Sequence, residues 1–136
     1  MAKSKPFTMR LSQETDVWIE HESRRTHRSK GAVVEALTEE GVRMRRFRGV
    51  AFRGPEHDRR AWVIGTAFDV WELITGYRDF GSLDRVLAES DITELQLQLA
   101  LRYAETYPDE IERALEANRL MSEQAMLLYP TLFSRR

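Results

Sequence analysis

The sequence predicts a mainly helical fold in two parts, with a short strand near the start of the chain and a β-hairpin near its middle. Apolar residues recur at helical spacing through most of the 136 residues, and the longest such stretch covers 109–128. Phe7, Met9 and Leu11 instead alternate with polar residues, as in a strand with one buried face. A Gly-Pro turn at 54–58 lies between two short strand-like runs, which is typical of a hairpin.

The first part, residues 1–46, is expected to form a strand, a helix, a turn and a second helix. Ser12 suits the N-cap of a helix over 13–25, and Ser29 suits that of a helix over 30–46, because a serine hydroxyl accepts a first-turn N–H. Such a unit is too small to bury a core alone, and a lone strand leaves its backbone edge unpaired. The sequence therefore predicts a homodimer. The apolar residues expected to pack in it are Phe7, Met9, Leu11, Val17, Trp18, Ile19, Val33, Val34, Leu37 and Val42.

The second part is expected to hold the hairpin and several helices. Pro108 separates the last two helices and suits the first turn of the second one, where a missing N–H costs little. Pro130 ends the last helical pattern and leaves a short apolar tail. The predicted strands cover 50–53 and 61–64, and the predicted helices cover 68–77, 82–90, 93–107 and 109–128.

Charge is unevenly distributed along the chain. Residues 1–53 carry twelve Lys and Arg against seven Asp and Glu, whereas residues 54–136 carry nine against fifteen. A basic front half is expected where a protein meets a polyanion such as nucleic acid. The chain has no cysteine, which excludes disulfides and thiolate metal sites and favours the reducing cytoplasm as its location. No apolar run approaches the roughly 18 residues of a membrane span, and the first lysines precede no signal-peptide core.

The sequence contains no pattern of catalytic or cofactor-binding residues. His21, His27 and His57 share no metal-ligand spacing. The carboxylates of the second part have no neighbouring nucleophile or glycine-rich phosphate loop. We therefore expect no enzyme activity, no metal and no cofactor.

Several stretches carry a resemblance to a known family. Residues 7–12 (Phe-Thr-Met-Arg-Leu-Ser) and 25–30 (Arg-Thr-His-Arg-Ser-Lys) resemble the ribbon-helix-helix fold of small bacterial repressors and antitoxins. Residues 49–53, 69–72 and 103–112 occur in the order found in one group of VapB-like antitoxins. The resemblance implies a dimeric ribbon-helix-helix followed by a small helical domain with a β-hairpin.

The same resemblance implies a type II antitoxin, which represses its own operon and neutralises a ribonuclease toxin, usually one with a PIN domain. Residues 1–46 are then the DNA-binding and dimerisation domain, 47–118 the helical antitoxin-like domain and 119–136 a toxin-binding tail. Two alternatives stay open: a free-standing repressor without a toxin, and an adaptor in which the strand only dimerises.

Thr8 and Arg10 face away from the apolar side of the predicted strand. In a ribbon of two paired strands, both copies would enter a major groove, where Arg10 suits guanine and Thr8 suits a base edge or a thymine methyl. Phosphate contacts are predicted for Lys5, and for Arg28, Ser29 and Lys30 at the start of the second helix, where free N–H groups favour an anion. For the cluster of Arg43, Arg45, Arg46, Arg48 and Arg53, contact with phosphate and a solvated linker are equally compatible with the sequence.

The C-terminal tail is predicted to bind the toxin as an apolar helix with an extension. Arg135 or Arg136 would enter the acidic metal site expected of a PIN ribonuclease. The alternative is that the tail folds back onto its own domain or onto the dimer mate. The predicted toxin-binding residues are Met121, Leu127, Leu128, Tyr129, Leu132, Phe133, Arg135 and Arg136.

Overall fold

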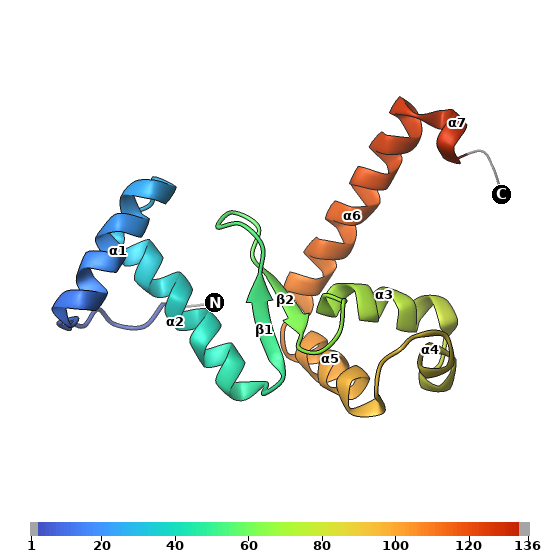
Figure 1. Cartoon of the computed structure of the whole chain (residues 1–136), viewed down its shortest axis with the longest axis horizontal. Helices are drawn as coiled ribbons and strands as arrows, with labels where there is room; N and C mark the ends of the chain where they lie inside the picture. Colours follow the sequence, from blue (N-terminus) through green and yellow to red (C-terminus); the bar gives the residue numbers. More distant parts are fainter. Residues whose placement is uncertain (1–2, 134–136) are drawn as a thin grey trace. The chain divides into compact units, whose positions relative to one another are not determined.

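A computed structural model describes residues 3–133 (Figure 1). The chain divides into two compact units, Met1–Val42 and Arg43–Arg136, and each is described by itself below. In the described part of the chain the fold is mainly helical with a single two-stranded antiparallel sheet, which confirms the predicted secondary-structure class.

The first unit is built from two helices, α1 (Gln13–Thr26) and α2 (Lys30–Arg46), the last turn of which belongs to the second unit. Ser12 caps α1 through its hydroxyl, which accepts a first-turn N–H at 3.3 Å. Ser29 does the same for α2 at 3.1 Å. Both predicted helices and both predicted caps are confirmed, because these signals act within a few residues of where they stand.

Residues 3–12 adopt no regular secondary structure, so the predicted N-terminal strand is not formed in a single chain. A strand needs a neighbour to satisfy its N–H and C=O groups, and the predicted neighbour is a second copy. Phe7 and Met9 are accordingly 79 % and 56 % exposed. Of the other residues expected to pack in the dimer, Val17, Trp18, Leu37 and Val42 are exposed in one copy, and only Ile19 and Val33 are buried among the described residues of this unit.

The second unit begins with the hairpin formed by β1 (Val50–Arg53) and β2 (Arg60–Val63). The strands pair antiparallel with Val50 opposite Val63, close to the predicted positions. Gly54, which leads into the turn, has a φ of +107°, and a Cβ there would overlap a backbone carbonyl across the turn. The turn therefore requires glycine at this position.

Helices form the rest of the second unit. α3, α4 and α5 pack against one another, and α6 crosses α3 and α5 before it extends beyond them (Figure 1). The predicted helices are confirmed with shifts of up to three residues at their ends, and the stretch from Pro130 to Phe133, predicted only as part of a short apolar tail, forms a short helix. The helices are α3 (Val70–Phe80), α4 (Leu83–Glu89), α5 (Glu94–Thr106), α6 (Pro108–Leu128) and α7 (Pro130–Phe133).

The core of the second unit lies between the hairpin and these helices. Tyr103 and Leu97 of α5 are fully buried at its centre, and α6 contributes Ile111. Beyond Leu115, α6 no longer takes part in this core. The other buried members are Val50, Ala61, Val63, Val70, Leu73, Ile74, Val86, Leu99 and Ala100.

Asp69 is the one buried charged residue in the described part of the chain, at 3 % exposure. Its carboxylate accepts a hydrogen bond from Arg53 Nε at 2.7 Å and another from Trp71 Nε1 at 3.2 Å. Its backbone N–H donates to Glu72, which completes a capping box at the start of α3. Asp69 thus links β1 to α3. These hydrogen bonds also allow the buried carboxylate to remain charged.

The unit boundaries differ from the predicted ones. The first unit ends at Val42 and not at residue 46, because Arg43 and Arg46 bond to aromatic and acidic side chains of the second unit. The predicted tail from residue 119 begins inside α6, which runs without a break from Pro108 to Leu128.

Candidate nucleic-acid interface and partner surface

The turn between α1 and α2 is fixed by local hydrogen bonds. His27 ends α1 in the left-handed conformation, with a φ of 54°. Ser23 Oγ donates to the carbonyl oxygen of Arg28 at 2.6 Å, and Arg28 Nε donates to Thr26 Oγ1 at 3.2 Å. Ser29 follows directly as the cap of α2. The start of α2, where phosphate contact is predicted, is therefore held in one conformation within this unit.

Lys30 is already paired within the chain. Its ammonium forms ion pairs with the carboxylates of Asp16 and Glu20 on α1, the second at 3.4 Å. The hydrogen bond to Asp16 raises the pKa of Lys30. For the predicted phosphate contact, Lys30 has to exchange these carboxylates for phosphate oxygens, whereas an anion can still meet the first-turn N–H groups that do not donate to Ser29.

The predicted DNA-contacting residues of the N-terminal segment are exposed. Lys5, Thr8 and Arg10 all reach solvent, and none has a hydrogen-bond or ion-pair partner among residues 3–133. Lys3 pairs with Glu35 of α2, which anchors the start of the segment to that helix. The structure thus leaves the Arg10 guanidinium free to meet a ligand.

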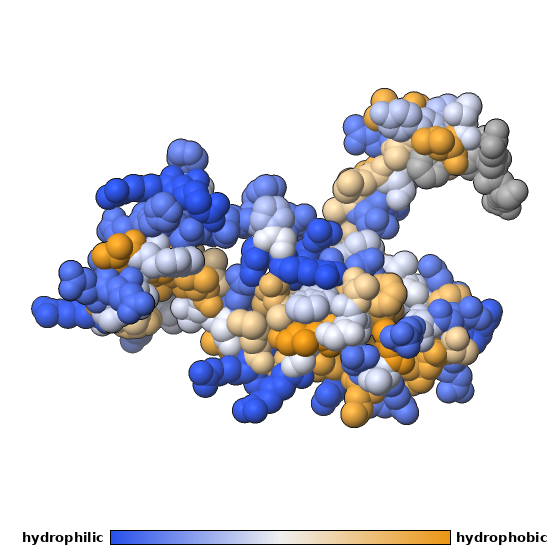
Figure 2. Space-filling view, viewed as in Figure 1, coloured by the Kyte–Doolittle hydropathy of each residue, from blue (hydrophilic) through white to orange (hydrophobic). Residues whose placement is uncertain are grey.

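An uncovered apolar surface accompanies this segment. Val17 and Trp18 of α1 and Leu37 of α2 line a shallow hollow of about 550 Å³, to which the buried Ile19 also contributes. Trp18 is 51 % exposed. Figure 2 shows hydrophobic side chains at the surface of these two helices. Phe7 and Met9 of the N-terminal segment are also exposed. We use the name N-terminal apolar face for the exposed residues Phe7, Met9, Val17, Trp18 and Leu37, of which Val17, Trp18 and Leu37 line one hollow and form an apolar patch of the kind that marks interaction sites.

Two of the clustered arginines serve the second unit. Arg43 Nη1 donates to Glu110 Oε1 at 2.7 Å and to the hydroxyl of Tyr103 at 3.0 Å, and its guanidinium lies 4.1 Å from the ring centre of Tyr107. The Tyr103 hydroxyl donates to Glu110 Oε2 at 2.6 Å, and Arg46 Nη1 donates to the Tyr107 hydroxyl at 3.0 Å. Burial, followed by the bond to Glu110, raises the pKa of Tyr103. Arg43 and Arg46 therefore hold an aromatic cluster together.

The remaining members of the arginine cluster differ in what they contact within the described part of the chain. Arg53 pairs with Asp69, so it too is part of the fold. Arg45 and Arg48 are exposed and have no partner in the described part of the chain. The spacing of Tyr103, Tyr107 and Glu110, four and three residues apart, is the sequence pattern that could have indicated the aromatic cluster.

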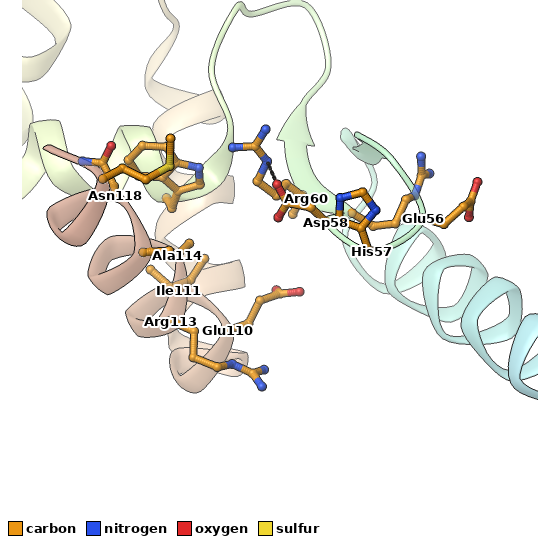
Figure 3. A pocket seen from close by; sticks show the side chains of 14 residues that line it. Glu56, His57, Asp58, Arg60, Glu110, Ile111, Arg113, Ala114 and Asn118 are labelled. Carbon is orange, nitrogen blue, oxygen red and sulfur yellow. Dashed lines mark ion pairs between the residues drawn. The ribbon is translucent and has the colours of Figure 1, made fainter. Parts of the chain in front are cut away.

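A groove opens in the second unit between the hairpin turn and α6. Its volume is about 480 Å³. Figure 3 shows the turn residues Glu56–Arg60 on one side and α6 residues from Glu110 to Asn118 on the other. Trp71, Ala114 and Ala117 also line the groove. Its lining therefore combines charged side chains from the turn and α6 with an apolar part.

The far half of α6 carries the predicted toxin-binding residues on an exposed surface. Leu127 is 83 % exposed and Met121 is 71 % exposed. Arg135 and Arg136 lie outside the described residues, as does the side chain of Phe133. The exposed apolar residues from this half through α7 are Leu120, Met121, Met126, Leu127, Leu128, Tyr129 and Leu132.

Among residues 3–133, no group of three or more His, Asp or Glu side chains is arranged to hold a metal ion. Within the same range, no helix has the length and apolar character needed to cross a membrane.

Comparisons of the chain with protein-family models, with curated proteins and with solved structures give no significant match.

Proposed function

We propose that the chain is a homodimeric DNA-binding antitoxin. Its first unit pairs with a second copy through the N-terminal segment, reads operator DNA and represses its operon. Its C-terminal region, α6 with α7, binds and neutralises a ribonuclease toxin, for which a PIN-domain enzyme is the expected class.

The observation that carries the proposal is the N-terminal apolar face. The first unit buries only Ile19 and Val33 among its described residues and leaves Phe7, Met9 and Trp18 in water. Covering a large apolar side chain contributes about 1.5–3 kcal/mol. A second copy that adds its own segment as a strand covers this face and pairs the open backbone edge at once.

DNA binding follows from the geometry of such a pair. If Phe7, Met9 and Leu11 turn toward the partner, then alternation along a strand turns Thr8 and Arg10 outward. A two-stranded ribbon fits the major groove, and Arg10 offers two parallel N–H donors to guanine. The fixed start of α2 adds an anion site beside the ribbon.

The toxin-binding role is supported by the exposed apolar residues of α6 and α7. An amphipathic helix that lacks a cover in its own chain is suited to a groove on a partner protein. Leu127 and Leu128 lie near the end of α6, beyond the core of the second unit. A free-standing repressor remains the alternative for a chain whose operon encodes no ribonuclease.

Replacing Met9 by aspartate tests the dimer. Because Met9 is exposed in one copy, the change leaves the single chain intact, but it buries a carboxylate in the paired ribbon. We expect dimerisation to weaken by roughly a hundredfold or more, measured by sedimentation, with loss of operator binding in a mobility-shift assay. Gln13→Asp adds the same charge at an exposed position and is the control. An unchanged dimer that still binds the operator would refute the proposal.

Replacing Leu127 by aspartate tests the partner surface. We expect the variant to lose inhibition of the proposed ribonuclease partner, because a charge would enter an apolar contact, and to bind operator DNA as before. Binding should weaken by roughly tenfold to a hundredfold. Gln124→Asp places the same charge at a polar position of the same helix and should still inhibit. Equal inhibition by both variants would exclude this surface.

A further inference from the structure

Most of the groove between the hairpin turn and α6 takes no part in the proposed function. Of the residues that line it, Met121 alone belongs to the predicted DNA-binding or toxin-binding residues. Its volume of about 480 Å³ lies within the range of small-ligand sites, roughly 300–1,000 Å³. A small molecule with an apolar body therefore fits between its two walls. The apolar lining residues, from β2, α3 and α6, are Ala61, Trp71, Ile111, Ala114, Ala117 and Met121.

The buried carboxylate of Asp69 positions two of the lining residues. Its Oδ2 accepts a hydrogen bond from Trp71 Nε1 at 3.2 Å and lies 3.6 Å from Nε of Arg60. Asp69 is 3 % exposed, and its other oxygen is bound to Arg53 at 2.7 Å, so the carboxylate itself is fixed. One buried group thus holds an aromatic ring and a cation side by side at the groove. Support of this kind from behind a site is what keeps a binding arrangement in place before the ligand arrives.

The Arg60 guanidinium still has its hydrogen-bond donors to give. Its Nε lies 3.6 Å from Asp69 and 3.8 Å from Asp58, and both distances are longer than a hydrogen bond. Within residues 3–133 Arg60 donates no hydrogen bond at all. Figure 3 shows its side chain beside Asp58, on the hairpin side of the groove. A ligand can therefore accept from Arg60 without breaking a hydrogen bond of the fold.

The charges around the groove favour an anion. Glu110 is bound to Arg43 at 2.7 Å, and Arg43 does not line the groove. Asp58 lies beside the guanidinium just described, and Glu56 is not free either. Arg113, in contrast, is exposed on the α6 side and has no partner in the described part of the chain (Figure 3). The lining carboxylates are thus engaged, and the charge left for a ligand is positive.

We infer that this groove binds a small organic acid, whose carboxylate accepts from Arg60 and whose apolar body lies against Trp71 and the alanines of α6. A guanidinium offers parallel N–H donors that match the two oxygens of a carboxylate. Arg113 adds attraction from the opposite wall. The inference goes beyond the proposed function and does not depend on it, because every contact belongs to the second unit of one chain.

The test titrates the full-length chain with phenylacetate and with its neutral analogue phenylacetamide. Binding is followed by NMR on the indole N–H resonances of the three tryptophans, Trp18, Trp62 and Trp71. We expect the Trp71 resonance to shift with saturation while that of Trp18, in the first unit, stays in place. Phenylacetate should bind about tenfold or more tightly than the amide, because only the acid makes a charge-assisted pair. Equal affinities, or an unchanged Trp71 resonance, would overturn the inference.

Replacing Arg60 by glutamine tests the carboxylate contact. We expect Arg60→Gln to bind phenylacetate about tenfold or more weakly and phenylacetamide as before. Arg53 keeps its bond to Asp69 in this variant, so the fold is retained. Arg102→Gln is the control, since Arg102 is exposed on α5, has no side-chain partner within residues 3–133 and does not line the groove. Equal weakening by both variants would show an effect of net charge alone and would rule out the assigned contact.

A second variant and a second probe locate the ligand and define its class. Ala117→Phe fills the groove from the exposed side of α6 and should abolish binding of both compounds, whereas Ser122→Phe adds the same ring to an exposed position outside the groove and should change nothing. Unchanged binding to Ala117→Phe would place the ligand elsewhere. The peptide acetyl-Ala-Glu-Ala-amide should bind more weakly than phenylacetate. Tighter binding of this peptide would replace the small acid by an acidic protein segment and so contradict the inference.

Discussion

A chain with Arg10 replaced by alanine is expected to lose its preference for operator DNA while it remains folded and dimeric. Arg10 is exposed and unpaired among the described residues, so its removal takes nothing from the fold. A bidentate contact to guanine contributes about 1–3 kcal/mol of discrimination, and a dimer makes two of them, so the specific affinity should fall roughly thirtyfold to ten-thousandfold. A mobility-shift titration against operator and scrambled DNA measures the ratio.

Arg24→Ala is the matched control for this prediction. Arg24 is also an exposed arginine of the first unit, and its ion pair with Glu20 on α1 is long, at 3.9 Å. Both variants lose one positive charge per chain, so both should lose similar nonspecific affinity at low salt. If Arg10→Ala kept the full ratio of operator to scrambled affinity, Arg10 would not read bases.

Truncating Tyr103 to alanine should produce the largest loss of stability in the second unit. Tyr103 is fully buried, its ring lies edge-on to Phe47 at 5.3 Å, and its hydroxyl joins Arg43 to Glu110. Removing a buried aromatic ring costs about 3–5 kcal/mol, which is a large share of the stability of a small domain. Urea unfolding followed by circular dichroism measures the loss.

Tyr103→Phe separates the ring from the hydroxyl. This variant keeps the packing and the direct pair of Arg43 with Glu110, so it should cost only about 1–2 kcal/mol. Because burial raises the pKa of Tyr103 above the 10.0 of a free tyrosine, the neutral form stabilises the fold below pH 10, and this stability is lost as the pH rises further. The phenylalanine variant should lack that alkaline loss. Equal destabilisation by both variants would show that the hydroxyl, not the ring, holds the cluster.

The local part of the fold was predictable from the sequence. Ser12, Ser29 and Pro108 each act on the helix that begins beside them, so their positions fix where α1, α2 and α6 start. The hairpin was predictable for the same reason, since Gly54 is required by the turn itself. Such signals need no knowledge of what lies elsewhere in the chain.

The contacts between distant residues were not predictable. Arg43 meets Glu110 across 67 positions and Arg53 meets Asp69 across 16, and no spacing rule connects such partners. The sequence therefore left open whether Arg43 and Arg53 contact phosphate or lie in a solvated linker, and it indicated no role for Asp69. A single chain cannot form the strand pairing of the N-terminal segment, because the hydrogen-bond partners of this segment belong to a second copy in the proposed dimer.

The small core of the first unit has a consequence for how the proposed repressor responds to its own abundance. Among its described residues this unit buries only Ile19 and Val33, so in the proposed dimer it would gain much of its apolar burial on association, and its stability would rise with the concentration of the chain. The second unit carries a larger core of its own, so its stability would depend less on a second copy. Dilution of the chain in a growing cell would then dissociate the proposed DNA-binding dimer first, and transcription of the operon would resume. The concentration of the chain would in this way control its own synthesis.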